Sequence, residues 1–382
     1  MKSGSGGRVN RRFLRWLLGP GIFVFAVSFA GNGQKISDVN GARTIHNSRR
    51  PARLPGYTSE LTLVEELTIG RGTDEQTQFM ELQSVQADSD GRIYALDPKA
   101  YAVKVFDADG RFLRSFGKRG QGPGEFTAPG RVVLTPSGEV AVSDIDNRRI
   151  CFFTREGELK RELSTASWNF LLFRVNARGD IFADVVSIKE PGTMSFELLK
   201  FGPDLSSPTV LASEPFPVLP NHVNPFRPRF LHGLTRNGGL AWAVSSRYEI
   251  TVLDPDGKPR LKVYKEPEPN PLTNRDRKAL LREEFGDKGP PAGVTMDFPS
   301  SFPPLYSLIV TDADQIIVRT NVRNAQGWII HEVFDPEGRF VSRFSLGQEE
   351  YVMMVAEGKA YTMVSEDGDG IPLVKRYRLV WK

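Results

Sequence analysis

The 382-residue chain contains one cysteine, Cys151, and only four histidines. A single cysteine excludes an intramolecular disulfide framework and any metal site built from several thiolates. No nucleophile elbow of the hydrolase type appears in the sequence. The apolar stretch near the N-terminus, Trp16–Ala30, has 15 residues and contains Gly19-Pro20-Gly21. It is therefore shorter than the about 20 apolar residues of a membrane-spanning helix.

Glycine and proline are abundant, with 36 and 27 residues, respectively. This content favours many short elements joined by turns over long helices. With 40% hydrophobic and 25% charged residues the composition is that of an ordinary globular protein. A chain of this length usually makes two or three domains, but an all-β ring can use it as one.

The first thirty residues have the order of a secretory signal. A basic start precedes the apolar stretch, and Ser28-Phe29-Ala30 supplies small residues ahead of a cleavage point before Gly31. The basic residues are Arg8, Arg11, Arg12 and Arg15. We therefore predict a signal peptide over residues 1–30 and export to the periplasm or the extracellular space. The mature chain would have no membrane span, and an uncleaved membrane anchor is the alternative.

Residues 31–56 have few large apolar groups and no apolar periodicity, which predicts a flexible tether. The folded domain is predicted over residues 57–382. Charge divides along the same boundaries. The formal net charge is +4, but residues 1–30 contribute +5 and residues 31–56 another +4, so residues 57–382 carry −5. An acidic folded domain argues against nucleic acid as a partner.

A turn followed by a strand of small and β-branched residues recurs six times. The copies are 92–97, 139–144, 180–185, 240–245, 315–320 and 359–364. Five of them follow a glycine, at Gly91, Gly138, Gly179, Gly239 and Gly358, and the fifth copy follows Asp314. These turn positions lie 41 to 75 residues apart. A base period of about 40 residues with two stretched intervals is typical of four-stranded propeller blades with insertions.

A second hairpin marks most repeats, with a turn of the Asp-x-x-Gly type at 107–110, 154–157, 254–257 and 335–338. The sixth repeat ends with Leu373–Trp381 as its third strand, so its outer strand is missing. Leu61–Ile69 at the other end of the domain can supply it, which would protect the open sheet edges. The sequence therefore predicts an all-β fold, a six-bladed β-propeller with four-stranded blades, closed by an N-terminal strand.

One stretch carries a family resemblance. Residues 116–129 (FGKRGQGPGEFTAP), 138–144 (GEVAVSD) and 146–150 (DNRRI) together resemble an NHL repeat. The chain as a whole resembles bacterial six-bladed β-propeller proteins with NHL-like repeats. This resemblance implies the fold but hardly the activity, since the architecture serves binders, lyases, hydrolases and RNA-binding platforms.

Long connections are predicted to emerge on one face of the ring, at 70–81, 117–130, 213–233 and 266–304. Long loops on a rigid scaffold are common places for binding. The last connection, between blades four and five, contains a predicted helix that begins after Thr273 and ends at Gly286. We expect this insertion to cover part of the tunnel mouth.

The candidate binding residues lie in one of these connections. They are His222, Arg227, Arg229 and His232. Two imidazoles do not make a zinc site, which takes three or four protein ligands. No cofactor is therefore predicted, and a metal-ligand set is left undefined.

Two functions follow from this pattern. We expect a secreted, non-enzymatic binding or scaffold propeller, a monomer that presents its long loops to a protein or small-molecule ligand. The alternative is a metal-dependent hydrolase or lyase with its site at the tunnel mouth. Calcium-dependent propeller lactonases use Glu, Asn and Asp ligands from different blades, and calcium enters only under this alternative.

Overall fold

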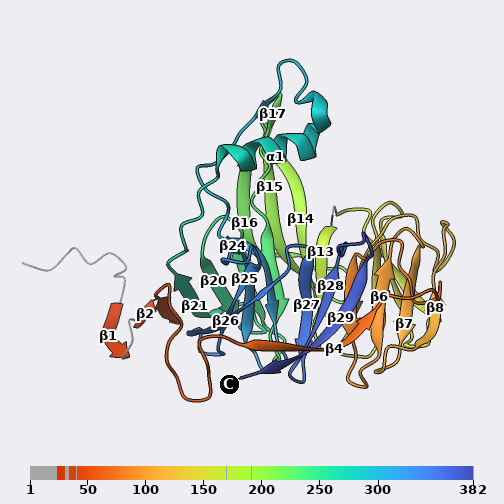
Figure 1. Ribbon diagram of the computed structural model, residues 1–382, viewed down its shortest axis with the longest axis horizontal. Helices are drawn as coiled ribbons and strands as arrows, with labels where there is room; N and C mark the ends of the chain where they lie inside the picture. Colours follow the sequence, from red (N-terminus) through yellow and green to blue (C-terminus); the bar gives the residue numbers. More distant parts are fainter. Residues whose placement is uncertain (1–23, 31–33, 40, 169, 191, 382) are drawn as a thin grey trace, which may run out of the picture.

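The computed structural model describes residues 24–30, 34–39, 41–168, 170–190 and 192–381. Six antiparallel sheets form a ring, which is the predicted six-bladed β-propeller with four strands to a blade (Figure 1). Blade one comprises β5 (Ser84–Ala87), β6 (Ile93–Asp97), β7 (Ala102–Phe106) and β8 (Phe112–Phe116). Blade two comprises β9 (Pro129–Leu134), β10 (Val140–Asp144), β11 (Arg149–Phe153) and β12 (Leu159–Ser164). Blade three comprises β13 (Phe170–Val175), β14 (Ile181–Glu190), β15 (Thr193–Phe201) and β16 (Thr209–Pro217).

The second half of the ring follows the same plan. Blade four comprises β18 (Phe230–Leu234), β19 (Leu240–Val244), β20 (Glu249–Leu253) and β21 (Pro259–Lys265). Blade five comprises β23 (Leu305–Val310), β24 (Ile316–Arg323), β25 (Ile329–Phe334) and β26 (Phe340–Leu346). Blade six comprises β27 (Glu350–Ala356), β28 (Lys359–Val364), β29 (Leu373–Val380) and β4 (Thr62–Ile69).

The ring closes as predicted. Strand β4 pairs antiparallel with β29, from Thr62 opposite Val380 to Ile69 opposite Val374. The N-terminal strand is thereby the outer strand of the last blade. Strand β29 is therefore paired on both edges, with β28 and with β4. Closure of this kind protects a propeller from the addition of strands from other chains.

The turns between strands use backbone conformations that the sequence anticipates. Asp314 replaces glycine in its turn and has φ of 59°, a conformation that Asp tolerates better than most residues. The turn before the fourth repeat differs from the prediction, since Gly238 and not Gly239 has the positive φ, of 85°. Gly338 has φ of 81°, and a Cβ there would lie 2.5 Å from Val263 Cγ2. A glycine is therefore required where the turn of blade five meets blade four.

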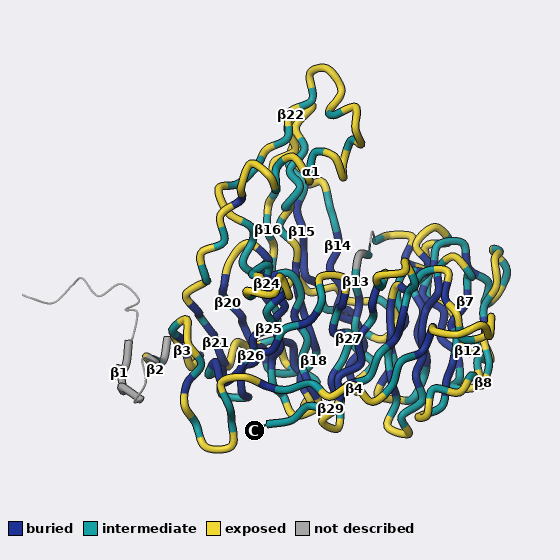
Figure 2. The backbone as a smooth tube through the Cα atoms, viewed as in Figure 1, coloured by how far each residue is buried: buried dark blue, intermediate teal, exposed yellow. Residues whose placement is uncertain are grey.

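Apolar side chains fill the spaces between blades. Among the described residues they form six clusters, one for each pair of neighbouring blades. The strands of the ring are accordingly rich in buried positions (Figure 2). Between blades one and two, for example, Val103 and Val105 pack with Val132 and Val142, all fully buried. Each such side chain contributes roughly 1.5–3 kcal/mol by burial. The ring is therefore stabilised by contacts between blades as well as by the ladders within them.

The N-terminal region departs from the prediction of a flexible tether over residues 31–56. Strand β3 (Ala42–Asn47) pairs in parallel with β21, the outer strand of blade four. Two further strands, β1 (Val24–Ala30) and β2 (Gln34–Val39), extend the same sheet. Of the predicted signal peptide, residues 1–23 lie outside the described residues, so its cleavage stays a prediction.

Residues 42–69, here called the belt, run along the outer edges of three blades. At the end of β3, the side-chain Nδ2 of Asn47 donates to Gly338 O at 2.9 Å, and Asn47 Oδ1 accepts from Phe340 N at 2.8 Å. Ala52 N then donates to Phe340 O at 2.7 Å before the chain enters β4 in blade six. The tether prediction failed because the segment has few apolar residues, but Ala42 and Ile45 are buried against strands far along the chain.

Replacing Ile45 with alanine is expected to lower the free energy of unfolding by roughly 2–5 kcal/mol, because Ile45 is fully buried against blades four and five. Arg43→Ala on the same strand is the matched control. Arg43 is exposed, so its loss should change the stability by less than about 0.5 kcal/mol. Urea unfolding measures both variants. If both variants change the free energy of unfolding by the same small amount, Ile45 is not packed against the ring and the docking of the belt is contradicted.

One part of the ring rises above the rest (Figure 1). Strands β14 and β15 are ten and nine residues long and extend beyond the disc. Two-residue strands β17 (His222–Val223) and β22 (Thr295–Met296) pair in parallel above them. The helix α1 (Asn274–Phe285) lies beside this pair and has the predicted capping box of Thr273 and Asp276. We call residues 186–197, 218–228 and 266–304 together the tower.

Candidate functional site

A cavity of about 1000 Å³ opens at the tunnel mouth, on the face from which the long connections emerge. Every blade contributes to its wall. One residue from each blade in turn is Lys99, Arg131, Arg174, Arg229, Tyr306 and Tyr351. Small-molecule sites in proteins usually have volumes of about 300–1,000 Å³, so this cavity has the size of a ligand site.

A buried polar pair lies in the cavity wall. Asp184 is on the second strand of blade three and His232 on the inner strand of blade four, and His232 Nε2 lies 3.3 Å from Asp184 Oδ1. Asp184 Oδ1 also accepts from Leu172 N at 2.9 Å. Burial lowers the pKa of His232, although the hydrogen bond to Asp184 opposes this. His232 is therefore neutral at pH 7, and its Nε2 donates to the carboxylate.

Two arginines lie on neighbouring inner strands beside this pair. Arg131 is on β9 and Arg174 on β13, and both line the cavity. Burial lowers the pKa of Arg131 to about 10. Burial also lowers the pKa of Arg174 well below its usual range, and the nearby charge of Arg131 adds to that shift. Both side chains are half-buried and line the cavity.

An aromatic wall lies across the cavity. The rings of Tyr306 and Tyr351 are 5.9 Å apart. The Arg319 guanidinium lies 4.2 Å from the first ring and 4.5 Å from the second, and Arg319 Nη2 donates to Gln348 O at 2.6 Å. Burial raises the pKa of Tyr351 to about 12. These contacts hold the two tyrosine rings in place in the cavity wall.

The structure brings together two of the four predicted binding residues. Arg229 and His232 line the cavity. His222 and Arg227 do not, because the connection after β16 runs up the tower before it returns to β18. His222 Nδ1 instead lies 2.9 Å from Asp297 Oδ2 on the tower, and the Arg227 guanidinium lies 5.9 Å from the Phe216 ring.

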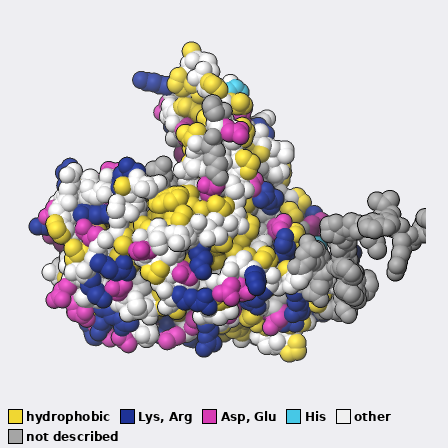
Figure 3. All heavy atoms as spheres, turned by 180° about the vertical axis from the view of Figure 1, so that it is seen from behind, with side chains coloured by type: hydrophobic (Ala, Val, Ile, Leu, Met, Phe, Trp, Pro, Cys, Tyr) yellow, Lys and Arg dark blue, Asp and Glu magenta, His cyan; other side chains and the backbone are white. Residues whose placement is uncertain are grey.

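The expectation that the insertion covers the tunnel mouth is wrong for this cavity. No residue of 266–304 lines it. The insertion pairs instead with the connection that follows blade three, where Thr295 N donates to Asn221 O and Asp297 N to Val223 O, both at 2.8 Å. It also covers a separate cavity of about 510 Å³ above blades four and five. The tower rises from the ring (Figure 3), and its insertion does not contribute to the wall of the tunnel-mouth cavity.

Sequence reasoning missed Arg131, Arg174 and Asp184. Each is one charged residue inside a short apolar strand, in PGRVVL, FLLFRV and IFADVV. Such a residue on one of the first two strands of a blade lies near the tunnel or a neighbouring blade. A single charged residue in an apolar strand can be recognised in the sequence and assigned to its blade. The sequence does not indicate which of these charged residues lie close together in the folded ring.

The opposite mouth of the tunnel holds a second cavity, of about 770 Å³. Arg174, Ile309 and Met353 line both cavities, so these residues lie at the middle of the tunnel. Arg236 and Ala313 belong to the far mouth alone.

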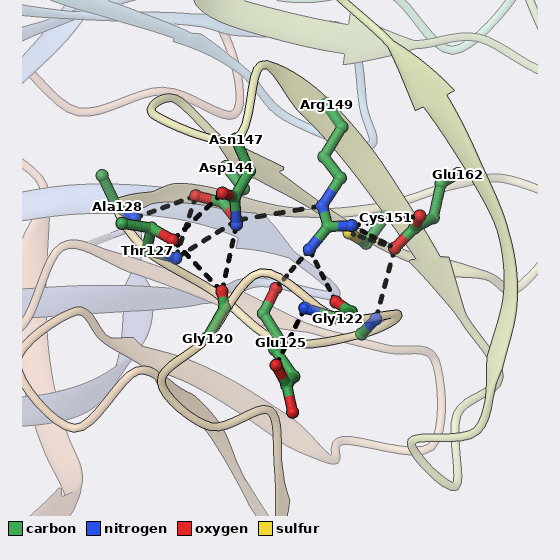
Figure 4. A network of polar contacts seen from close by, with 11 residues as sticks. Gly120, Gly122, Glu125, Thr127, Ala128, Asp144, Asn147, Arg149, Cys151 and Glu162 are labelled. Carbon is green, nitrogen blue, oxygen red and sulfur yellow. Dashed lines mark hydrogen bonds and ion pairs between the residues drawn. The ribbon is translucent and has the colours of Figure 1, made fainter.

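The glycine-rich connection into blade two is held by side chains of that blade (Figure 4). Asp144 Oδ1 accepts from Thr127 N and Ala128 N at 3.2 and 2.9 Å. Asn147 Nδ2 donates to Gly120 O at 3.1 Å, and Arg149 Nη2 to Gly122 O at 2.8 Å. Each side chain thus fixes loop backbone. The one cysteine beside this network is buried, and burial raises the pKa of its thiol to about 12.

Within the described parts of the chain, no three His, Cys, Asp or Glu side chains converge as a metal site would require. The helix α1 is too short and too polar to cross a membrane, and no other helix in the described ranges could do so.

The comparisons with known proteins agree with the fold. Residues 70–191, which span blades one and two and the first two strands of blade three, match the family described as 6-bladed beta-propeller. The ring and this match together identify the chain as a six-bladed β-propeller protein. The finer NHL-like detail stays a prediction.

Solved structures extend the likeness over the ring. A member of the DUF4221 family from Bacteroides vulgatus is 11% identical, with a TM-score of 0.50 over 85% of this chain and 99% of its own. The calcium-binding protein regucalcin from Agrobacterium tumefaciens is 10% identical, with a TM-score of 0.45 over 81% and 93%. Virginiamycin B lyase from Staphylococcus aureus is 11% identical, with a TM-score of 0.43 over 84% and 100%. At such identities a likeness concerns the fold alone. Among curated proteins, none matches the chain significantly.

Proposed function

We propose that this chain is an exported, non-enzymatic binding propeller that takes a small molecule at the tunnel mouth. The observation that carries the proposal is the cavity of about 1000 Å³, whose wall is built from all six blades. Much of that wall is rigid, because many of its side chains, such as those of Arg131, Arg174 and Tyr306, come from strands held by their neighbours. Export rests on the basic, apolar and small-residue order of residues 1–30.

The chemistry of the wall supports binding over catalysis. The carboxylate of Asp184 is engaged by Leu172 N and by His232, and the thiol of Cys151 lies in the packed space between blades. The alternative, a metal-dependent hydrolase or lyase of the calcium type, needs several converging ligands. No observation on the described residues favours that alternative.

A cavity-filling variant tests the proposal. Ser307 lines the tunnel-mouth cavity and Ala313 lines the far one, and both are in blade five. The protein is equilibrated with a mixture of neutral, cationic and anionic small molecules, and the retained compounds are identified by mass spectrometry. Ser307→Trp is expected to reduce retention at least tenfold, because the indole occupies the cavity, whereas Ala313→Trp should retain the same compounds as wild type.

Two outcomes would contradict the proposal. Retention that is equal in both variants and wild type would show that binding does not use the tunnel mouth. A retained compound recovered with a changed mass, and only after incubation with active protein, would indicate catalysis.

A further inference from the structure

The two arginines in the tunnel-mouth wall lack counter-charges. Among the described residues, no carboxylate oxygen lies within 4.0 Å of a guanidinium nitrogen of Arg131 or Arg174. Arg131 makes no side-chain hydrogen bond there, and its buried Nε has no acceptor. Arg174 has one bond, from Nη1 to Phe173 O at 2.9 Å. Most of their donors therefore remain unused inside the tunnel.

Other arginines of this chain show what a partnered guanidinium looks like. Arg247 donates to both oxygens of Glu214 at 2.8 and 2.9 Å, although it is half exposed. Arg149 lies 3.1 Å from Glu162, and Arg339 lies 2.6 Å from Asp335. The tunnel pair differs from these three arginines, because no carboxylate of the described residues pairs with it. A charge that is partly removed from water and has no partner is unfavourable, so an incoming anion would stabilise both guanidinium groups.

The acids around the cavity do not fill this role. Asp184 is near enough to favour the charged forms of both arginines, but its Oδ1 is engaged by Leu172 N and His232. Glu81 and Lys99 pair with one another at the exposed rim, 3.4 Å apart. Glu349, also in the lining, accepts from Ser365 Oγ at 2.8 Å.

We propose that the tunnel mouth binds a monocarboxylic acid with an apolar body, whose carboxylate lies between Arg131 and Arg174. The inference rests on the proposed function as a small-molecule binder at this cavity. With His232 neutral, the two arginines and Asp184 carry one net positive charge, which a single carboxylate neutralises. A dianionic phosphate would leave excess negative charge beside Asp184. Guanidinium groups present planar donor pairs that match the geometry of a carboxylate.

The remainder of the wall decides the body of the ligand. Beside the arginines the lining includes a set of apolar and aromatic side chains, which are Leu172, Phe230, Leu231, Leu308, Tyr306 and Tyr351. An aliphatic or aromatic body would bury its surface against these side chains.

Benzoate is the probe, with benzamide as its neutral counterpart of the same shape and phenyl phosphate as the dianion. Binding to the full chain is measured by ligand-observed NMR titration. We expect saturable binding of benzoate, and at least tenfold weaker binding of benzamide and of phenyl phosphate. Arg131→Gln and Arg174→Gln should each weaken benzoate binding by about 10- to 100-fold, since each removes charged hydrogen-bond donors. Arg236→Gln, at the far mouth, is the matched control and should bind as wild type does.

Thermal unfolding of the same variants separates loss of binding from loss of folding. Removing an unpartnered, half-buried charge should leave the unfolding temperature unchanged or raise it. The inference is overturned if benzoate shows no saturation up to about 10 mM, if it binds to Arg131→Gln and Arg174→Gln as tightly as to wild type, or if benzamide binds as tightly as benzoate. If phenyl phosphate binds more tightly than benzoate, the site prefers a phosphate, and the inference of a carboxylate ligand is overturned. If wild type retains other compounds in the cavity-filling experiment while benzoate fails, the carboxylate inference falls and the proposed function stands.

Discussion

Glu332→Ala is expected to lower the free energy of unfolding by about 3–5 kcal/mol. Lys265 Nζ lies 3.0 Å from Glu332 Oε1, with side chains 0% and 4% exposed, respectively. The hydroxyl of Tyr248 donates to the other oxygen of the same carboxylate. Loss of Glu332 would leave the Lys265 ammonium buried between the Tyr248 and Phe340 rings with no counter-charge. Urea unfolding measures the change.

Two controls identify burial of charge as the cause. Lys265→Met combined with Glu332→Leu removes both charges, and its stability should lie within about 1 kcal/mol of wild type or above it. Glu60→Ala breaks an exposed pair in the same blade, since Glu60 lies 3.7 Å from Arg343, and should cost less than about 1 kcal/mol. If Glu332→Ala is as mild as Glu60→Ala, the pair does not stabilise the blade.

A chain that begins at residue 71 is expected to lose the cooperative folded state altogether. It lacks β4, so the edge of β29 is open, and the buried Leu61 and Ile69 are removed from the clusters on either side of blade six. Each lost core residue costs about 2–5 kcal/mol, and the total stability of a domain is only about 5–15 kcal/mol. Size-exclusion chromatography and urea unfolding should show aggregates and no sharp transition.

The matched control is a chain that begins at Gly41. It retains the belt and β4, so it should elute as a single species and unfold cooperatively. Equal unfolding midpoints for the two truncated chains would show that ring closure does not depend on the N-terminal strand.

The fold could be predicted because its signals are local. The turn glycines and the Asp-x-x-Gly hairpins lie within a few residues of the strands that they connect. The lack of an outer strand in the sixth repeat is visible in the same way, because the chain ends directly after the third strand. The docking of β3 could not be predicted in this way. Ile45 is one apolar residue in a polar segment, and its partner strand begins at Pro259. The length of β14 and β15 was also missed, since their outer halves are held by pairing with each other and with β16.

The candidate site was predicted in part. The long connections correctly indicated the face, and Arg229 and His232 lie in the cavity. Arg131 and Arg174 are 43 positions apart and meet only because their blades are neighbours in the ring. His222 was misplaced because the rise of the connection along the tower depends on pairing between β17 and β22, which are more than 70 positions apart.

The position of the belt in the chain also determines when its contacts can form during folding. Its residues are the first of the folded part to be synthesised, but their partners lie in blades four, five and six, with the last pairs at Val374–Val380. Contacts of such large sequence separation form late, because the intervening chain must be organised first. The segment 42–69 therefore stays without its partners until nearly the whole ring exists. An exported chain, which emerges N-terminus first, would have to keep these strands apart from other molecules during all of that time.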